Sequence, residues 1–256
     1  MDRHLILEGV PNFRDFGGYA ARDGRRLTRG LLWRSGGHQN ASDADLAAIA
    51  ALDLALVVDL RTPTERTGAP SRRPEAFRGL VVAGEHDAAD TWIAFLNRSD
   101  LSVASLRAYL VDYYRKAPHE PRHLDVFARY FRHLAKAEGP ALVHCSAGKD
   151  RTGMIVALTH IVLGVCEDDV LADYLLTNDP ARIEPRMKAV GDFMEEATGR
   201  RPSEAAVRVA MGVEAEYLAS AFAAMRERHG SVEAYMERVL GVDAALREAL
   251  EARLLA

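Results

Sequence analysis

The chain has 256 residues, with 33 lysines and arginines against 37 aspartates and glutamates, and a formal net charge of −4. This length allows one large domain, or one domain with an appendage. The slightly acidic balance gives no electrostatic reason to expect nucleic-acid binding, although it leaves a locally basic cleft open.

Cysteine content and apolar runs bear on the compartment. The two cysteines, Cys145 and Cys166, are too few for a disulfide framework and favour a reducing setting. Residues 1–10 carry several charges and lack the apolar core of a signal peptide. The longest apolar run, 154–165, is shorter than the roughly 20 residues that span a bilayer. We therefore expect a cytoplasmic protein without stable membrane insertion, and export without a signal peptide stays open.

The first part of the chain combines a capped helix with short apolar strands. Ser42 is a candidate N-cap for a helix over residues 42–52, because an aspartate follows it three residues later. A valine-rich run at 54–60 predicts a buried strand. A weaker strand is expected at 80–82, and residues 84–118 are expected to be helical or irregular.

A second strand and a long helix follow in the middle of the chain. A helix is expected over 124–135, closed by Gly139-Pro140. Residues 141–144 predict another short buried strand, and 152–163 predict a long apolar helix that ends at Gly164. Helices that alternate with short apolar strands predict a layered α/β domain.

The chain after Asp169 has a mainly helical pattern. Its clearest segments are expected helices at 207–228, 232–240 and 244–255. We therefore expect a single domain over 1–256, with a core at about 1–180 and a helical C-terminal extension at about 181–256.

The loop from Cys145 to Arg151 is the most informative stretch, because it joins a predicted strand to a predicted helix. A helix N-terminus offers unpaired N–H groups and a partial positive charge to an anion. The guanidinium of Arg151 can bind two phosphate oxygens at once. Three small residues let the backbone curl closely around phosphate: Ser146, Ala147 and Gly148.

The same surroundings favour the thiolate form of Cys145, which is the nucleophilic form of a cysteine. Attack on phosphorus would give a phosphocysteine, with Arg151 and the loop N–H groups holding the phosphate oxygens. Thr152 is a candidate hydrogen-bond donor to the sulfur, and His144 is a candidate for orienting the loop. A buried cysteine after a strand is usually a small core residue, but such a residue does not require glycine, lysine and arginine at these offsets.

The stretch from His144 to Gly153 resembles the signature loop of the protein tyrosine phosphatase superfamily, and Lys149-Asp150 resembles that of its atypical bacterial branch. Further segments are similar to that branch and occur in the matching order: 12–19 (NFRDFGGY), 32–36 (LWRSG), 58–61 (VDLR) and 174–178 (YLLTN). The resemblance implies a central, mostly parallel sheet flanked by helices, with additional C-terminal helices. It also implies a cysteine-dependent protein-tyrosine phosphatase that needs no metal or other cofactor. Some members of the branch also act on phosphoserine, phosphothreonine or phosphoinositides, so dual specificity or a phosphoinositide substrate stays open.

Two aspartates are candidates for the general acid that protonates the leaving oxygen. The resemblance favours Asp150, inside the loop. Asp59 is the second candidate, because it ends a buried strand and active sites of α/β sheets collect there. Its other interpretation is an ion pair with Arg61 or Arg151. Lys149 is either a second phosphate-binding cation, which would suit a phosphoinositide, or a solvated surface lysine.

Other functions remain open at this stage. The same loop could bind phosphorylated partners without turnover, although such a module would usually lack the nucleophile or the arginine. A thiol redox protein would need a resolving cysteine near Cys145, and Cys166 lies beyond a predicted helix. Residues 119–123 (HEPRH) have the spacing of a zinc-protease motif, but Pro121 would disrupt the helix that this motif requires. The oligomeric state and the natural substrate are not fixed by the sequence.

Overall fold

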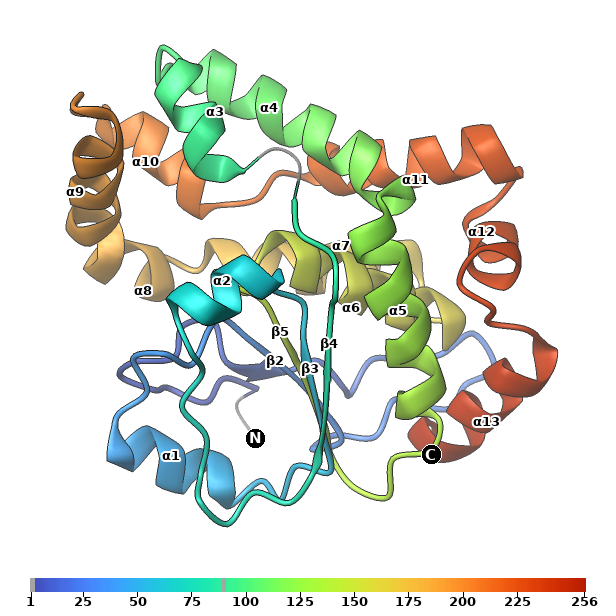
Figure 1. Cartoon of the computed structure of the whole chain (residues 1–256). Helices are drawn as coiled ribbons and strands as arrows, with labels where there is room; N and C mark the ends of the chain where they lie inside the picture. The colour runs from blue at the N-terminus through green and yellow to red at the C-terminus, as the bar shows by residue number, and fades with distance from the viewer. Residues whose placement is uncertain (1–2, 89–90) are drawn as a thin grey trace.

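A computed structural model, which describes residues 3–88 and 91–256, has a five-stranded sheet at its centre (Figure 1). The strands are β1 (Arg14–Asp15), β2 (Leu32–Ser35), β3 (Leu56–Asp59), β4 (Leu80–Ala83) and β5 (Ala141–His144). Their order is β1-β2-β5-β3-β4, and every pairing is parallel except that of β1 with β2. The expected mostly parallel sheet, with strands near 54–60, 80–82 and 141–144, is confirmed.

Helices make up most of the remaining chain. The α-helices are α1 (Asp43–Ala50), α2 (Pro63–Gly68), α3 (Trp92–Arg98), α4 (Val103–Lys116), α5 (Pro121–Leu134), α6 (Asp150–Val162), α7 (Glu167–Leu175), α8 (Pro180–Ile183), α9 (Met187–Thr198), α10 (Glu204–Met211), α11 (Ala215–His229), α12 (Val232–Arg238) and α13 (Ala244–Leu254). Three 3-10 turns, η1 (Ala117–His119), η2 (Leu176–Asn178) and η3 (Glu184–Arg186), connect some of them. Helix α1 begins at the predicted cap, because the Ser42 hydroxyl accepts a hydrogen bond from the backbone N–H of Asp45. None of the helices in the described part of the chain is long and apolar enough to cross a membrane.

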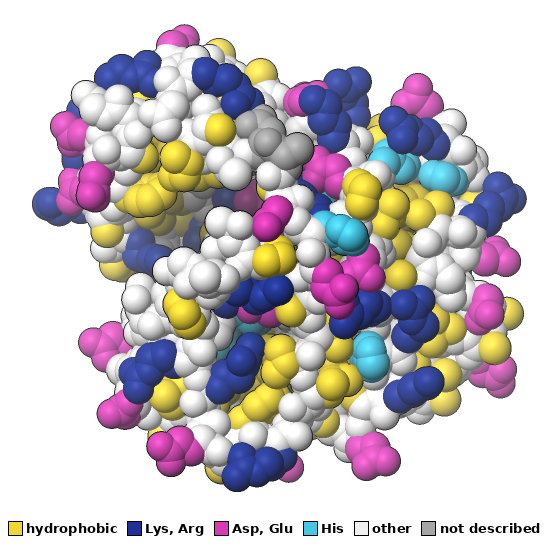
Figure 2. Space-filling model, viewed as in Figure 1, with side chains coloured by type: hydrophobic (Ala, Val, Ile, Leu, Met, Phe, Trp, Pro, Cys, Tyr) yellow, Lys and Arg dark blue, Asp and Glu magenta, His cyan; other side chains and the backbone are white. Residues whose placement is uncertain are grey.

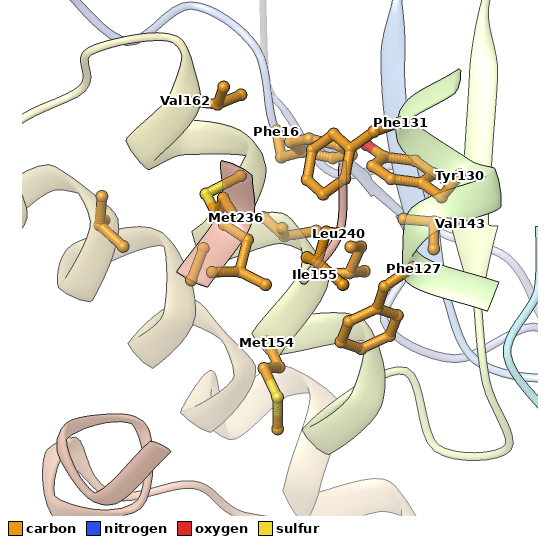
Figure 3. Packing of buried hydrophobic residues seen from close by; sticks show 14 of the residues in the cluster. Phe16, Phe127, Tyr130, Phe131, Val143, Met154, Ile155, Val162, Met236 and Leu240 are labelled. Atoms are coloured by element: carbon orange, nitrogen blue, oxygen red, sulfur yellow. The ribbon is translucent and has the colours of Figure 1, made fainter. Parts of the chain in front are cut away.

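Successive side chains of the central strands enter two hydrophobic clusters, one on each face of the sheet. Val58 and Val143 point into the larger cluster, which α5 and α6 cover. Figure 3 shows Phe127 of α5 and Ile155 of α6 close to Val143. Val57 lies in the smaller cluster on the other face, together with side chains of α1. The sheet is thus flanked by helices on both faces, as the sequence predicts.

The last three helices, α11 to α13, are built into the same core, whereas α9 and α10 pack with α3 and α4 in a separate hydrophobic cluster. Tyr217 of α11, Met236 of α12 and Leu254 of α13 belong to the cluster that covers the sheet. Helix α11 packs along α4, and the upper group of helices in Figure 1 forms a layer above the sheet. The division into a core of about 1–180 and an extension of about 181–256 stays a prediction.

The prediction of a single helix over 207–228 is wrong. The chain breaks between α10 and α11, where Gly212 has an extended backbone. The Asn178 side chain causes this break by replacing helical hydrogen bonds. Its Oδ1 accepts from Val213 N and its Nδ2 donates to Val213 O, both at 2.8 Å. Gly212 was a visible sign of a helix end, whereas the contribution of Asn178, which is distant in sequence, was not.

Candidate active site

The loop that carries Cys145 leaves the carboxyl end of β5, in the middle of the sheet. His144, the last residue of β5, lies between Ser35 of β2 and Asp59 of β3. Helix α2 lies over the upper ends of the strands in Figure 1. Figure 2 shows a hollow between α2 and the helices above it, with hydrophobic and basic side chains along it. Cys145 itself is 2% exposed, so its thiol lies at the base of the loop.

Gly148 allows the loop to curl against β2. Its φ is +69°, and a Cβ there would lie 2.5 Å from the backbone N of Gly36 and the carbonyl of Ser35. The carbonyl oxygen of Gly148 accepts hydrogen bonds from Asn12 Nδ2 at 2.6 Å and Arg34 Nη2 at 2.9 Å. The segments 12–19 and 32–36 therefore hold the back of the phosphate-binding loop.

A buried ion cluster connects these segments to α7. Arg14 and Arg34 are fully buried, and both point at Asp173. Arg34 Nη1 lies 3.1 Å from Asp173 Oδ2, and Arg14 Nη2 donates to the Asp173 carbonyl at 3.0 Å. Burial alone would raise the pKa of Asp173, but the charges of Arg14 and Arg34 hold it below its ordinary value. The carboxylate is thus the shared counter-charge of two buried cations behind the loop.

We expect Asp173→Asn to lower the free energy of unfolding at neutral pH by about 3–5 kcal/mol, since it leaves buried cations without a counter-charge. Because folding lowers the Asp173 pKa, its stabilisation is present above the unfolded-state pKa of about 3.9 and is lost as the pH falls through the folded-state value. Urea unfolding of both proteins at neutral and acidic pH measures the difference. Asp192→Asn, which removes only surface ion pairs, is the matched control and should change little. Equal stabilities of the two variants would contradict the role of the cluster.

Arg151 is held by a carboxylate that sequence reasoning missed. Glu65 of α2 accepts from Arg151 Nη1 at 2.6 Å and from Nη2 at 2.8 Å, and the Ser146 hydroxyl donates to Glu65 Oε1 at 2.6 Å. Burial alone would lower the pKa of Arg151, but the hydrogen bonds with Glu65 and the charges of Cys145 and Glu65 raise it well above its ordinary value. Arg151 is therefore a fixed cation at the loop.

The local sequence explains how Glu65 is positioned. Thr62 caps α2 by accepting from the backbone N–H of Glu65, and Glu65 Oε2 accepts from the backbone N–H of Thr62 at 2.8 Å. This is a capping box with Pro63 at the first helical position. The pattern Thr-Pro-Thr-Glu after the strand was a visible signal for the helix start. It gave no indication that the glutamate would reach Arg151.

Asp150 and Lys149 lie side by side at the start of α6. Asp150 Oδ1 accepts a hydrogen bond from the Tyr114 hydroxyl at 3.2 Å, and Oδ2 lies 3.6 Å from Lys149 Nζ. The surface interpretation of Lys149 is wrong, because this side chain is buried and donates to the carbonyl of Gly212 at 3.1 Å. Burial lowers the pKa of Lys149, and the charge of Asp150 opposes that effect. The break before α11 thus supplies a wall of the site.

Asp59 forms the ion pair with Arg61 that was its alternative interpretation. Arg61 donates from Nε to Oδ1 at 2.9 Å and from Nη2 to Oδ2 at 2.7 Å. Burial alone would raise the pKa of Asp59, but His144 and Arg61 hold it below its ordinary value. Both carboxylate oxygens of Asp59 therefore accept from one guanidinium, which favours the ionised form of this side chain.

His144 and Thr152 border Cys145 on either side of the loop. His144 Nε2 lies 3.6 Å from Asp59 Oδ2, and burial lowers the pKa of His144 to about 4 despite that carboxylate. The Thr152 hydroxyl is buried and has no hydrogen-bond partner among the described residues. The expected hydrogen bond from Thr152 to the sulfur is therefore not formed in this structure.

Two other features do not contribute to the site. His119 lies in η1 and His123 lies in α5, which begins at Pro121, so the two histidines do not share one continuous helix as the zinc-protease motif requires. A cavity of about 440 Å³ lies near the amino-terminal ends of β3 and β4. None of the predicted site residues lines that cavity.

Comparisons with known proteins agree with this geometry. A family model described as the tyrosine phosphatase family matches residues 5–256. A Cupriavidus necator protein, whose name gives tyrosine-protein phosphatase as its candidate assignment, is 33% identical over 95% of this chain and 86% of its own length. The triple specificity protein phosphatase PtpB of Mycobacterium tuberculosis is 31% identical over 90% of this chain and 91% of its own.

A solved structure of P. aeruginosa TpbA in complex with pTyr aligns with 73% of this chain and 89% of its own, with 19% identity and a TM-score of 0.34. That likeness is too weak in shape to add to the fold described above. The family model and the two relatives, in contrast, span nearly the whole chain and include the loop at Cys145. The chain therefore belongs to the tyrosine phosphatase family, in its atypical bacterial branch, and is a cysteine-dependent phosphatase.

Proposed function

We propose that this enzyme hydrolyses phosphotyrosine in proteins, with Cys145 as nucleophile, Arg151 as phosphate ligand and Asp150 as general acid. The observation that carries the assignment is the pairing of Arg151 with Glu65 beside the loop that begins at Cys145. Glu65 holds the two terminal nitrogens of the guanidinium in a fixed plane next to Ser146. An arginine fixed in this way is preorganised to bind phosphate oxygens as charge develops on them.

The first step transfers the phosphoryl group to the enzyme. The thiolate of Cys145 forms a bond to phosphorus while the bond from phosphorus to the substrate oxygen breaks. Asp150 gives its proton to the departing oxygen, so that a neutral phenol or alcohol leaves. Arg151 and the N–H groups of residues 146–151 bind the three equatorial oxygens of the transferring group.

The second step releases phosphate. Water attacks the phosphorus of the phosphocysteine, and the ionised Asp150 accepts a proton from that water as the new bond forms. The bond from phosphorus to sulfur breaks and returns the electron pair to Cys145 as thiolate. The products are inorganic phosphate and an enzyme in its starting protonation state.

The substrate range is proposed to extend beyond phosphotyrosine. The name of the Mycobacterium tuberculosis relative, a triple specificity protein phosphatase, supports activity on phosphoserine or phosphothreonine as well. Lys149, beside Asp150 in the same loop, supports a phosphoinositide as a further substrate, because a second cation favours a substrate with more than one phosphate. We propose a cytoplasmic location, because two free cysteines favour a reducing compartment.

We expect Asp150→Asn to lower kcat/KM for phenyl phosphate by about 10²- to 10⁴-fold, the usual contribution of a general acid or base. The loss should be much smaller for p-nitrophenyl phosphate, because its leaving group departs without a proton. Steady-state kinetics on both substrates measure the ratio. Asp59→Asn is the competing variant. It should lower kcat/KM for both substrates by the same factor, since it removes the ion-pair partner of Arg61 and not the acid. A leaving-group-dependent loss in the Asp59 variant alone would move the role to Asp59.

A further inference from the structure

The Asp150 carboxyl accepts a hydrogen bond from a buried tyrosine, Tyr114, which in turn accepts one from a second buried tyrosine, Tyr174, and the mechanism above uses neither. Tyr114 of α4 donates to Asp150 Oδ1 at 3.2 Å, and Tyr174 of α7 donates to the Tyr114 hydroxyl oxygen at 2.7 Å. We propose that Tyr114 is a positioning residue for Asp150 and that Tyr174 sets the direction in which Tyr114 donates. This inference rests on the proposed role of Asp150 as the general acid.

The order of the hydrogen bonds follows from the number of protons. Each tyrosine hydroxyl has one hydrogen to donate. Tyr174 places its hydrogen on the oxygen of Tyr114, so the hydrogen of Tyr114 is directed at Asp150. Burial raises the pKa of both tyrosines well above the ordinary value, so both hydroxyls keep their protons at neutral pH. The pair is therefore a one-way donor to Oδ1.

Packing holds both rings in place. Tyr114 is fully buried, and its ring lies 5.8 Å from the ring of Tyr217 on α11. Tyr174 lies directly against α6, where a Cβ on Gly153 would approach its ring to 2.8 Å. Glycine at position 153 therefore lets α7 bring the tyrosine close to the helix that begins with Asp150. This contact explains why the 174–178 segment begins with a tyrosine and why the loop motif ends with a glycine at 153.

The consequence for the reaction is a carboxyl group with two unlike oxygens. Oδ1 is occupied by the Tyr114 hydroxyl, so the proton that Asp150 transfers resides on Oδ2, the oxygen that lies 3.6 Å from Lys149 Nζ. An aspartate without this anchor would rotate about its side-chain bonds and spend part of its time with the proton misdirected. Fixing a catalytic group in its productive orientation contributes to rate without changing its chemistry. Tyr114 should thus affect only those steps in which Asp150 transfers a proton.

We expect Tyr114→Phe to lower kcat/KM for phenyl phosphate by roughly tenfold or more, and that for p-nitrophenyl phosphate by less than about threefold. Tyr130→Phe is the matched control, because Tyr130 is another fully buried tyrosine of the same cluster and its hydroxyl bonds Thr159 rather than Asp150. The Tyr130 variant should lower kcat/KM for both substrates equally or not at all. Equal losses on the two substrates in the Tyr114 variant would overturn the proposal and leave Tyr114 as a structural residue only.

The double variant Tyr114→Phe/Asp150→Asn tests the positioning role of Tyr114 separately from the acid role of Asp150. If Tyr114 acts through Asp150, the double variant is no slower on phenyl phosphate than Asp150→Asn alone. If the losses in kcat/KM of the two single variants add in the double variant, Tyr114 does not act through Asp150. If Asp150→Asn itself shows no leaving-group dependence, the acid assignment fails. If it shows such dependence and Tyr114→Phe does not, only the positioning role fails.

Discussion

Replacement of Cys145 by serine is expected to abolish phosphate release, with a loss of at least about 10⁴-fold on every substrate, as losses of this order follow removal of an enzyme nucleophile. A cysteine thiol loses its proton far more readily than a serine hydroxyl, which would need a base to remove its proton before it attacked phosphorus. Phosphate should still bind, because Arg151 and Gly148 are held by Glu65, Asn12 and Arg34 and not by the sulfur.

The measurement is phosphate release by both proteins from p-nitrophenyl phosphate, a phosphotyrosine peptide, a phosphoserine peptide and short-chain phosphoinositides, with a chelator present. Isothermal titration with inorganic phosphate tests binding by the serine variant. Cys166→Ser is the control, since Cys166 is exposed at the N-terminus of α7, and it should behave as wild type. Hydrolysis retained by Cys145→Ser would refute the nucleophile, and the ranking of substrates by the wild type tests the preference for phosphotyrosine.

The parts of the site that could be predicted are those encoded in contiguous residues. The loop from Cys145 to Arg151 begins directly after β5, and its last two residues open α6. Such a junction is set by local backbone preferences. Strands β3 and β5 were predicted for the same reason, because a fully buried parallel strand is an unbroken apolar run. Strands β1 and β2 lie in segments that were matched by resemblance only. The segments at 12–19 and 32–36 were recognised by resemblance, and the structure gives their physical task in the contacts to Gly148.

The parts that could not be predicted depend on contacts between distant residues. Glu65 reaches Arg151 across 86 positions, and Tyr114 reaches Asp150 across 36. Neither residue stands out in its own segment: Glu65 is one member of a capping box, and Tyr114 is an apolar position of an amphipathic helix. Lys149 was assigned to the surface as an alternative because lysines are rarely buried. Its burial depends on the chain break at Gly212, which depends in turn on Asn178.

Arg151→Lys is the second change for which we expect a large loss, about 10²- to 10³-fold in kcat, comparable to the removal of one preorganised donor to a transition state. The substitution keeps the positive charge, so it tests geometry alone. Arginine binds Glu65 through Nη1 and Nη2 and still presents its Nε edge. A lysine ammonium is a single point that cannot hold the carboxylate and two phosphate oxygens together. Arg208→Lys, at an exposed ion pair with Glu184, is the matched control and should leave kcat unchanged.

Glu65→Gln completes this test, because it keeps the shape of the side chain and removes the charge that orients Arg151. If Glu65 serves to hold the guanidinium in its plane, this variant should lose activity by less than Arg151→Lys, and the two changes combined should cost no more than Arg151→Lys alone. If instead the Glu65 carboxylate competes with phosphate for Arg151, Glu65→Gln should lower KM and raise kcat/KM. The sign of the change in kcat/KM therefore decides whether the ion pair in the free enzyme prepares the site for phosphate or occupies it.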